Sequence, residues 1–335
     1  MTSPLYAQTT IPPVSLGAGL RTSFASTIPD EGDSTSEFLL NSARLYVNGG
    51  VTSKIKYMFN SEYNGGTNAV GVLDAVARIE ASPKMNIWMG RFLPPSDRAN
   101  LYGPYYSNQW GVYTDGIQNG HPAVFQGRDN GVAYWGDFGK AKISAGLFDA
   151  LSLNRVSSEP LFAARAQVDF WDKEGGYYLN GTYYGGKNLL SVGAAIQAQD
   201  GDTAFTLDFL LEKKGKNGGC FTLESEYANY AGLGGYDGAY SDSQGGYFLA
   251  SYLFKKPDNA MGAFEILGKF AQANFSQGLA KSAKDYDQKT TEFNLNYVIK
   301  EFNARLMIFF RNTNFSADSA RQDSNQVGVG LQIQM

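Results

Sequence analysis

Side chains capable of covalent or metal chemistry are almost absent from this sequence. His121 is the only histidine and Cys220 the only cysteine in 335 residues. One Cys excludes an intrachain disulfide and a cysteine metal cage, and one His excludes HExxH chemistry. A Ser-His-Asp triad would have to use His121, which stands between Gly120 and Pro122 in a long predicted loop. We therefore predict no enzyme activity, no metal and no cofactor, and a packing or lumen-lining role for Cys220.

The charged side chains are few and nearly balanced. Lys and Arg number 28 against 32 Asp and Glu, so the net charge is −4, and no Lys/Arg-rich run suggests a nucleic-acid partner. Aromatic residues make up 14% of the chain and Gly contributes 39 residues, which favours many short strands and tight turns. The sequence contains no apolar stretch of about 18 residues, so it predicts no transmembrane helix. The mean hydropathy of −0.29 still permits a transmembrane barrel, because a polar lumen face offsets the lipid face.

The elements that position these charges are strands, because apolar and polar residues alternate with period two. In segment 54–62, Ile55, Tyr57 and Phe59 share one face, whereas Lys54, Lys56, Asn60 and Glu62 share the other. Similar segments are 14–25, 37–48, 72–81, 86–92, 131–136, 140–148, 162–171, 189–198, 203–213, 220–230, 246–255, 261–274, 290–300, 303–313 and 325–335. No long segment shows helical spacing. The pattern therefore predicts sixteen strands.

The connections between these strands alternate between short turns and long loops. The long ones, 26–36, 93–130, 149–160, 231–245, 275–289 and 314–324, all fall on the external side if the chain starts in the periplasm. This predicts an all-β fold, a transmembrane antiparallel up-and-down barrel over residues 14–335. Residues 1–13 are expected to be the segment left after signal cleavage. Segment 173–188 also alternates; we interpret it as an elaborated periplasmic connection, and eighteen strands is the alternative.

The apolar face of the strands lacks charges, as a lipid-facing surface requires. Its members include the following residues: Leu73, Ala75, Ala77, Ile79, Phe162, Val168, Phe170, Phe205, Leu207, Phe209, Leu211, Phe293, Leu295, Tyr297, Leu306, Ile308 and Phe310. The alternative is a soluble multi-sheet protein in which this face forms the core. A ring of sixteen strands is too wide for side chains to fill, which favours a barrel in the bacterial cell outer membrane, in contact with lipopolysaccharide and phospholipid.

Several short stretches suggest a family. The last strand, Gln326–Met335, alternates to its end and resembles the carboxy-terminal strand of outer-membrane proteins, although those usually end in Phe. The arrangement resembles a Gram-negative general porin. Some short sequence stretches are similar to those of the phosphate-selective porin O and P family. They are Ser42–Val47, Leu73–Ala75, Gly90–Pro95, Asp129–Val132 and Asp172–Tyr178. The resemblance implies a sixteen-stranded barrel, commonly a homotrimer, with loop 3 folded inward; it does not establish phosphate transport.

The longest connection, 93–130, follows the fifth strand, where porins carry their pore-narrowing loop. Prolines at 94, 95 and 104 stiffen it, and its aromatic residues can pack on the wall while their polar ends form hydrogen bonds. The candidate constriction residues are Asp97, Arg98, Tyr102, Tyr105, Tyr106, Trp110, Asp115 and His121. The alternative for this loop is an external lid or a trimer contact.

The lumen face carries charges of both signs. The predicted pore-lining basic residues are Arg21, Arg44, Lys54, Lys56, Arg78, Arg305 and Arg311, and the acidic ones are Glu62, Asp208, Glu212, Glu224 and Glu226. The basic residues gather on strands 15, 1, 2 and 3 and most of the acids on strands 10 and 11, across the ring. One hypothesis is a transverse field between the two walls; the other is scattered, solvated charges.

These observations predict a porin, a passive diffusion channel for ions and small hydrophilic solutes. An anion- or phosphate-selective channel is one alternative, because Arg44, Lys54, Lys56 and Arg98 could line a path. The acids Glu62 and Asp97 beside them argue against it. A second alternative is a barrel that serves as a sheath or adhesin for a partner protein.

Overall fold

The protein forms a closed antiparallel barrel of sixteen strands. The computed structural model describes residues 13–112, 114–117, 127–150, 159–233, 239–280, 282–316, 319 and 321–335. The strands are β1 (Val14–Pro29), β2 (Thr35–Gly50), β3 (Ile55–Asn64), β4 (Ala69–Ser82), β5 (Met85–Phe92), β6 (Asp129–Asp137), β7 (Ala141–Phe148), β8 (Leu161–Asp169), β9 (Leu189–Gln199), β10 (Asp202–Lys214), β11 (Cys220–Ala231), β12 (Tyr240–Leu253), β13 (Ala263–Gly278), β14 (Tyr286–Lys300), β15 (Ala304–Phe315) and β16 (Ser324–Gln334). Each strand pairs with its sequence neighbours, and β1 pairs with β16 to close the ring. The predicted sixteen-stranded up-and-down barrel is confirmed.

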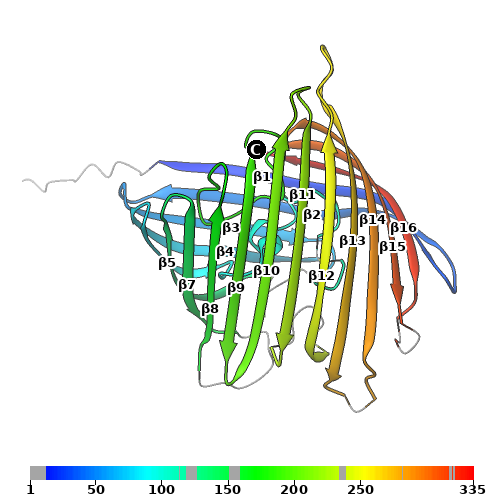
Figure 1. Ribbon diagram of the computed structural model, residues 1–335, viewed down its shortest axis with the longest axis horizontal. Coiled ribbons are helices and arrows are strands. Elements are labelled where there is room, and N and C mark those ends of the chain that lie inside the picture. The colour runs from blue at the N-terminus through cyan, green and yellow to red at the C-terminus, as the bar shows by residue number, and fades with distance from the viewer. Residues whose placement is uncertain are drawn as a thin grey trace, which may run out of the picture.

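The two rims of the barrel carry different connections (Figure 1). Because consecutive strands are antiparallel, the connections β1–β2, β5–β6, β7–β8, β11–β12, β13–β14 and β15–β16 lie on one rim, which we call the long-loop rim. The opposite short-turn rim carries tight turns such as 83–84 and 138–140. One long connection departs from this rule. It joins β8 to β9 on the short-turn rim, and we call its residues 170–188 the lumen insert.

The outward face of the strands is an apolar surface. Phe293, Leu295 and Ile308 are 58, 41 and 45% exposed, as a lipid-facing belt would be. Leu73 corrects the predicted face, because it points inward and is fully buried. The cause is a β-bulge: Asn60 pairs with Asp74 and Ser61 with Val72, so Leu73 is an extra residue that shifts the alternation. Asp74, the residue after the bulge, is also buried inside the barrel and accepts a hydrogen bond from Asn60.

Two chain segments enter the barrel and fill most of its described interior. The first is loop L3 between β5 and β6, described here by residues 93–112, 114–117, 127 and 128, which contains the short helix α1 (Arg98–Tyr102). The second is the lumen insert, which is not a membrane strand and so excludes the eighteen-stranded alternative. An aromatic core packs between the inner wall and these segments. It consists of Trp88, Phe92, Trp135, Phe148 and Tyr177. No helix among the described residues is long and apolar enough to cross a membrane.

Candidate functional site: the constricted lumen

Loop L3 is fastened to the inner wall by side chains that bind its backbone. Arg21 donates to the Trp110 carbonyl at 2.8 Å, and Arg305 donates to the Ser107 carbonyl at 2.6 Å. Gln332 donates to the Tyr105 carbonyl at 2.9 Å. An irregular loop crossing a barrel must have its backbone groups satisfied, and these wall residues supply the donors. The prediction that this loop folds inward is confirmed, and the external-lid alternative is excluded.

The lumen insert locks the first turn of L3 through a buried ion pair. Arg98 Nη1 and Nη2 donate to Glu174 Oε1 and Oε2 at 3.0 and 2.6 Å, and both side chains are fully buried. Burial alone would raise the pKa of Glu174, but Arg98 outweighs it and lowers the pKa to about 2. Tyr183 Oη also donates to Glu174 Oε1, at 2.8 Å. The insert and L3 are therefore joined by a bidentate, charge-assisted contact.

Backbone contacts extend this junction. Gly181 N donates to the Tyr106 carbonyl at 2.8 Å, and Tyr177 Oη donates to the Leu93 carbonyl at 2.7 Å. The far end of the insert is held by Glu212, whose carboxylate accepts from Thr182 Oγ1, Tyr183 N and Gly185 N at 2.7–2.8 Å. Glu212 thus binds the insert rather than open solvent.

The acids of β10 and β11 lie beneath L3. Asp208 and Glu226 are buried under α1, where Arg165 binds Asp208 and Glu226 faces the Ala99 amide at 3.5 Å. Glu224 accepts from Tyr102 Oη at 2.8 Å. The basic and acidic walls therefore do not face each other across open solvent, and the transverse-field hypothesis is wrong in that form. The reason is that L3 lies on the acidic wall and covers it.

The predicted basic residues divide between the lumen and the short-turn rim. Arg21, Arg44 and Arg305 are buried inside the barrel. Lys54 is exposed beside the start of β3, whereas Lys56 binds Glu80 at 2.6 Å and Arg78 lies 3.7 Å from the same carboxylate. Arg311 binds Glu292 at 3.2 Å. Most of these cations are thus paired within the wall.

The remaining candidates also have definite places. Tyr105 Oη lies 2.9 Å from Ser42 Oγ, and Trp110 stacks on Phe309 with ring centroids 5.9 Å apart. Asp115 of L3 forms an ion pair with Lys269 of β13. His121 lies outside the described residues. Cys220 is buried at the start of β11, and no group of three or more His, Cys, Asp or Glu in the described chain is arranged to hold a metal.

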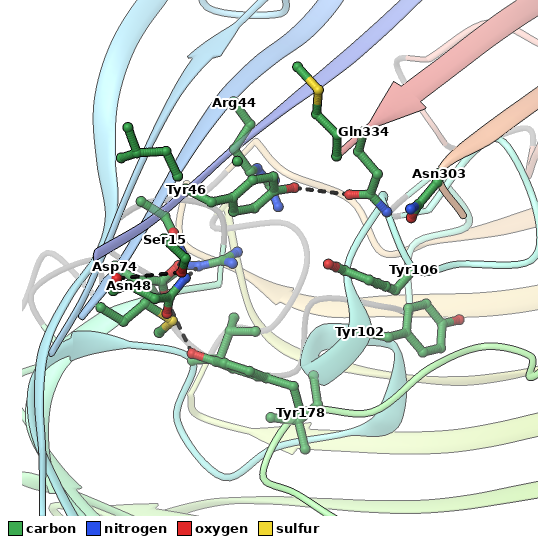
Figure 2. A pocket seen from close by; sticks show the side chains of 18 residues that line it. Ser15, Arg44, Tyr46, Asn48, Asp74, Tyr102, Tyr106, Tyr178, Asn303 and Gln334 are labelled. Carbon is green, nitrogen blue, oxygen red and sulfur yellow. Dashed lines mark hydrogen bonds and ion pairs between the residues drawn. The ribbon is translucent and has the colours of Figure 1, made fainter. Parts of the chain in front are cut away.

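An open cavity of about 380 Å³ separates L3 from the wall made by β1–β4. Figure 2 shows Arg44, Tyr46 and Asp74 on the strand side, and Tyr102 and Tyr106 of L3 facing them. Tyr178 of the lumen insert borders a third side. Ser15, Asn48, Asn303 and Gln334 extend the lining toward the short-turn rim. This gap therefore lies inside the barrel, between L3, the lumen insert and the strand wall.

Two ion pairs balance the charges beside this gap. Arg44 Nε donates to Glu62 Oε2 at 2.6 Å. Arg128 Nε lies 3.4 Å from Asp74 Oδ1, and Asn60 Nδ2 donates to Asp74 Oδ2 at 2.8 Å. Arg128, Asp74, Tyr178 and Glu174 are absent from the predicted site. Of these four, only Asp74 is placed on the lumen face by the alternation of its strand. The other three stand in irregular segments whose path the sequence pattern does not reveal.

The buried carboxyl of Asp97 should make the stability of the packed L3 depend on pH. Burial, together with nearby Asp208, raises its pKa from 3.8 to about 6, although the Asn100 amide that it caps lowers it. A carboxyl whose pKa is raised on folding favours the folded state at low pH. We therefore expect about 3 kcal/mol of unfolding free energy to be lost as the pH rises from 3.8 to about 6.

The measurement is urea unfolding in lipid vesicles at a series of pH values, with an Asp97→Asn variant. Asn is also a good helix cap, so this variant should retain the fold and lose this part of the pH dependence. Asp258→Asn, at an exposed turn, is the control. An Asp97→Asn variant with the same pH profile as the wild type would contradict the assignment.

Comparisons with known proteins agree with this geometry at the level of fold. No protein-family model matches the chain, and no curated protein matches it significantly. Among solved structures, the outer membrane channel DcaP of Acinetobacter baumannii superposes with a TM-score of 0.64 at 14% identity, covering 96% of this chain and 97% of that one. The fold is that of the outer-membrane porins.

Two further structures share this porin fold. The anion-selective porin from Comamonas acidovorans gives a TM-score of 0.60 at 15% identity, covering 96% of this chain and 99% of that one. OmpT of Vibrio cholerae, an outer membrane protein in its trimer form, gives a TM-score of 0.58 at 11% identity, covering 96% of this chain and 99% of that one. The narrower resemblance to phosphate-selective porins O and P has no support from these comparisons.

Proposed function

We propose that the protein is an outer-membrane porin, a passive diffusion channel for ions and small hydrophilic solutes. The observation that carries this proposal is the cavity between β1–β4 and L3, which lies inside a closed barrel with an apolar outer belt. A sixteen-stranded ring is wide enough for an aqueous path, and L3 narrows it. The solved channels of the same fold support the assignment.

The surroundings follow from the same features. The outer belt suits contact with lipopolysaccharide and phospholipid, which places the protein in the outer membrane. A homotrimer is proposed because a solved neighbour with this fold occurs in a trimer form. Residues 93–128 act as the constriction loop in this proposal.

The balanced gap favours weak ion selectivity over an anion-specific channel. Arg44 and Arg128 each have a carboxylate partner within 3.4 Å, so no stack of unpaired cations borders the cavity among the described residues. A sheath for a partner protein is disfavoured because the lumen insert and L3 occupy the described interior.

The experiment that tests the function is single-channel recording in a planar bilayer, with the reversal potential measured under a KCl gradient. We expect ohmic steps and a reversal potential near zero. A strongly anionic reversal potential with block by phosphate would favour the anion-selective alternative. Correctly folded protein without conductance would reject the channel assignment and favour the sheath or adhesin class.

A matched pair of variants tests whether the Arg44–Glu62 pair borders the path. Arg44→Gln leaves Glu62 uncompensated, so we expect the reversal potential to move toward cation selectivity. Glu62→Gln leaves Arg44 uncompensated and should move it toward anions. Lys255→Gln, exposed at the short-turn rim, is the control for a mere change in net charge. Equal reversal potentials in all three variants would place the pair off the conducting path.

A further inference from the structure

The gap between L3 and the β1–β4 wall has the composition of a binding site, not only of a passage. Four tyrosines border it: Tyr46 from β2, Tyr102 and Tyr106 from L3, and Tyr178 from the lumen insert. Its volume of about 380 Å³ falls at the lower end of the range for small-molecule pockets. The gap could therefore hold one small ligand at a time.

The tyrosines present both ring faces and hydroxyl groups to this space. Tyr106 is the most open, at 36% exposure, and Figure 2 shows its hydroxyl pointing toward the centre of the cavity. Tyr46 Oη donates to Gln334 Oε1 at 3.3 Å, and Tyr178 Oη lies 3.5 Å from Asp74 Oδ1. Tyr102 turns its hydroxyl away toward Glu224, which leaves its ring at the cavity border. Burial raises the pKa of Tyr106, so its phenol is neutral at physiological pH.

The other lining groups are neutral or already paired. Asn48, Asn60, Asn303 and Gln334 supply amide donors and acceptors. The guanidinium groups of Arg44 and Arg128 have carboxylate partners, and those ion pairs make the local charge close to zero. A free anion or cation entering the gap would have to compete with these internal partners, whereas a neutral solute would not.

We propose that this gap is a low-affinity subsite for neutral ring-shaped polyols, a hexose or a disaccharide, with Tyr106 as the main specificity-determining residue. A sugar ring has C–H faces that pack on aromatic rings and hydroxyl edges that pair with amides and phenols, which matches the lining. The inference rests on the proposed channel function, because it assigns that channel a preferred solute class.

The test is the current through a single channel in KCl with maltose added to the bath. Occupancy of the gap should reduce the current in a saturable way. Tyr106→Ala should weaken the block about tenfold, with the block of each variant expressed relative to that variant's own open-channel current. Tyr106→Phe keeps the ring and loses the hydroxyl, and should retain most of the block. Tyr227→Ala, on the outer face, is the matched control and should leave the block by maltose unchanged.

Three probes decide the solute class. Mannitol carries hydroxyls but no ring and should block less than maltose, and potassium gluconate tests whether charge matters. A current that falls with sugar only in proportion to solution viscosity would overturn the proposal, as would stronger block by gluconate than by maltose. Absence of any conductance from folded protein would instead be a failure of the proposed channel function, which separates the two outcomes.

Discussion

Replacing Glu174 with Ala should lower the free energy of unfolding by about 3–5 kcal/mol, the usual cost of leaving one member of a buried ion pair without its partner. Arg98 is fully buried, and its nearest remaining carboxylate would be Asp208, which lies 3.5 Å from its Nε and is already bound by Arg165. Its hydrogen bonds to the Asn180 carbonyl and Ser191 Oγ, at 3.0 and 3.4 Å, would not neutralise its charge. Urea unfolding in lipid vesicles, followed by tryptophan fluorescence, measures the loss. Trp88 is a suitable reporter because its ring lies 4.8 Å from that of Tyr177 in the insert.

A double-mutant cycle separates the ion pair from general packing. The cycle compares Arg98→Met and Glu174→Leu with the double variant Arg98→Met/Glu174→Leu. Because the double variant removes both charges, we expect it to lose much less stability than the two single variants together. The neighbouring pair Lys173–Asp137 is the control, since Lys173 is 47% exposed and its removal should cost less than about 1 kcal/mol. Strictly additive effects at 98 and 174 would show that the two side chains are not coupled.

Shortening the lumen insert should raise single-channel conductance several-fold. The β8–β9 ladder continues past the strand ends, because Phe170 N donates to the Leu190 carbonyl and Asp172 N to the Asn188 carbonyl. Residues 173–187 can therefore be replaced by an Asn-Gly turn without changing the pairing of the barrel. The gain arises because the insert supplies one border of the gap and supports L3 through Glu174 and Gly181.

The same recording under a KCl gradient checks this prediction. Glu174→Ala, with the full insert present, is the matched control for the loss of the ion pair alone. If the shortened protein conducts like the wild type, the insert does not border the path. If Glu174→Ala alone gives the full increase, the displacement of L3 rather than the volume of the insert is responsible.

The strand count and the lipid-facing surface could be predicted from the sequence because each depends on local regularity. The inward course of L3 was instead expected from its length and from the resemblance to porins. Alternation with period two decides which side chains of a strand share a face; β13 follows it from Ala263 to Phe275 and β14 from Tyr286 to Val298. Leu73 shows the limit of that rule, because it is an extra bulge residue that is buried next to the buried Asp74 and shifts the phase of the alternation.

Only the tertiary structure decided which charges border open space. Sequence parity placed Asp208, Glu224 and Arg44 alike on the lumen face, yet L3 covers the two acids and leaves Arg44 beside the gap. It also brought together Arg98 and Glu174, which are 76 residues apart. L3 and the insert are irregular, so their paths follow from long-range packing and buried ion pairs rather than from a repeating local pattern. For this protein, the sequence by itself determined the barrel, whereas the folding of those two segments into the lumen determined the shape and charge of its passage.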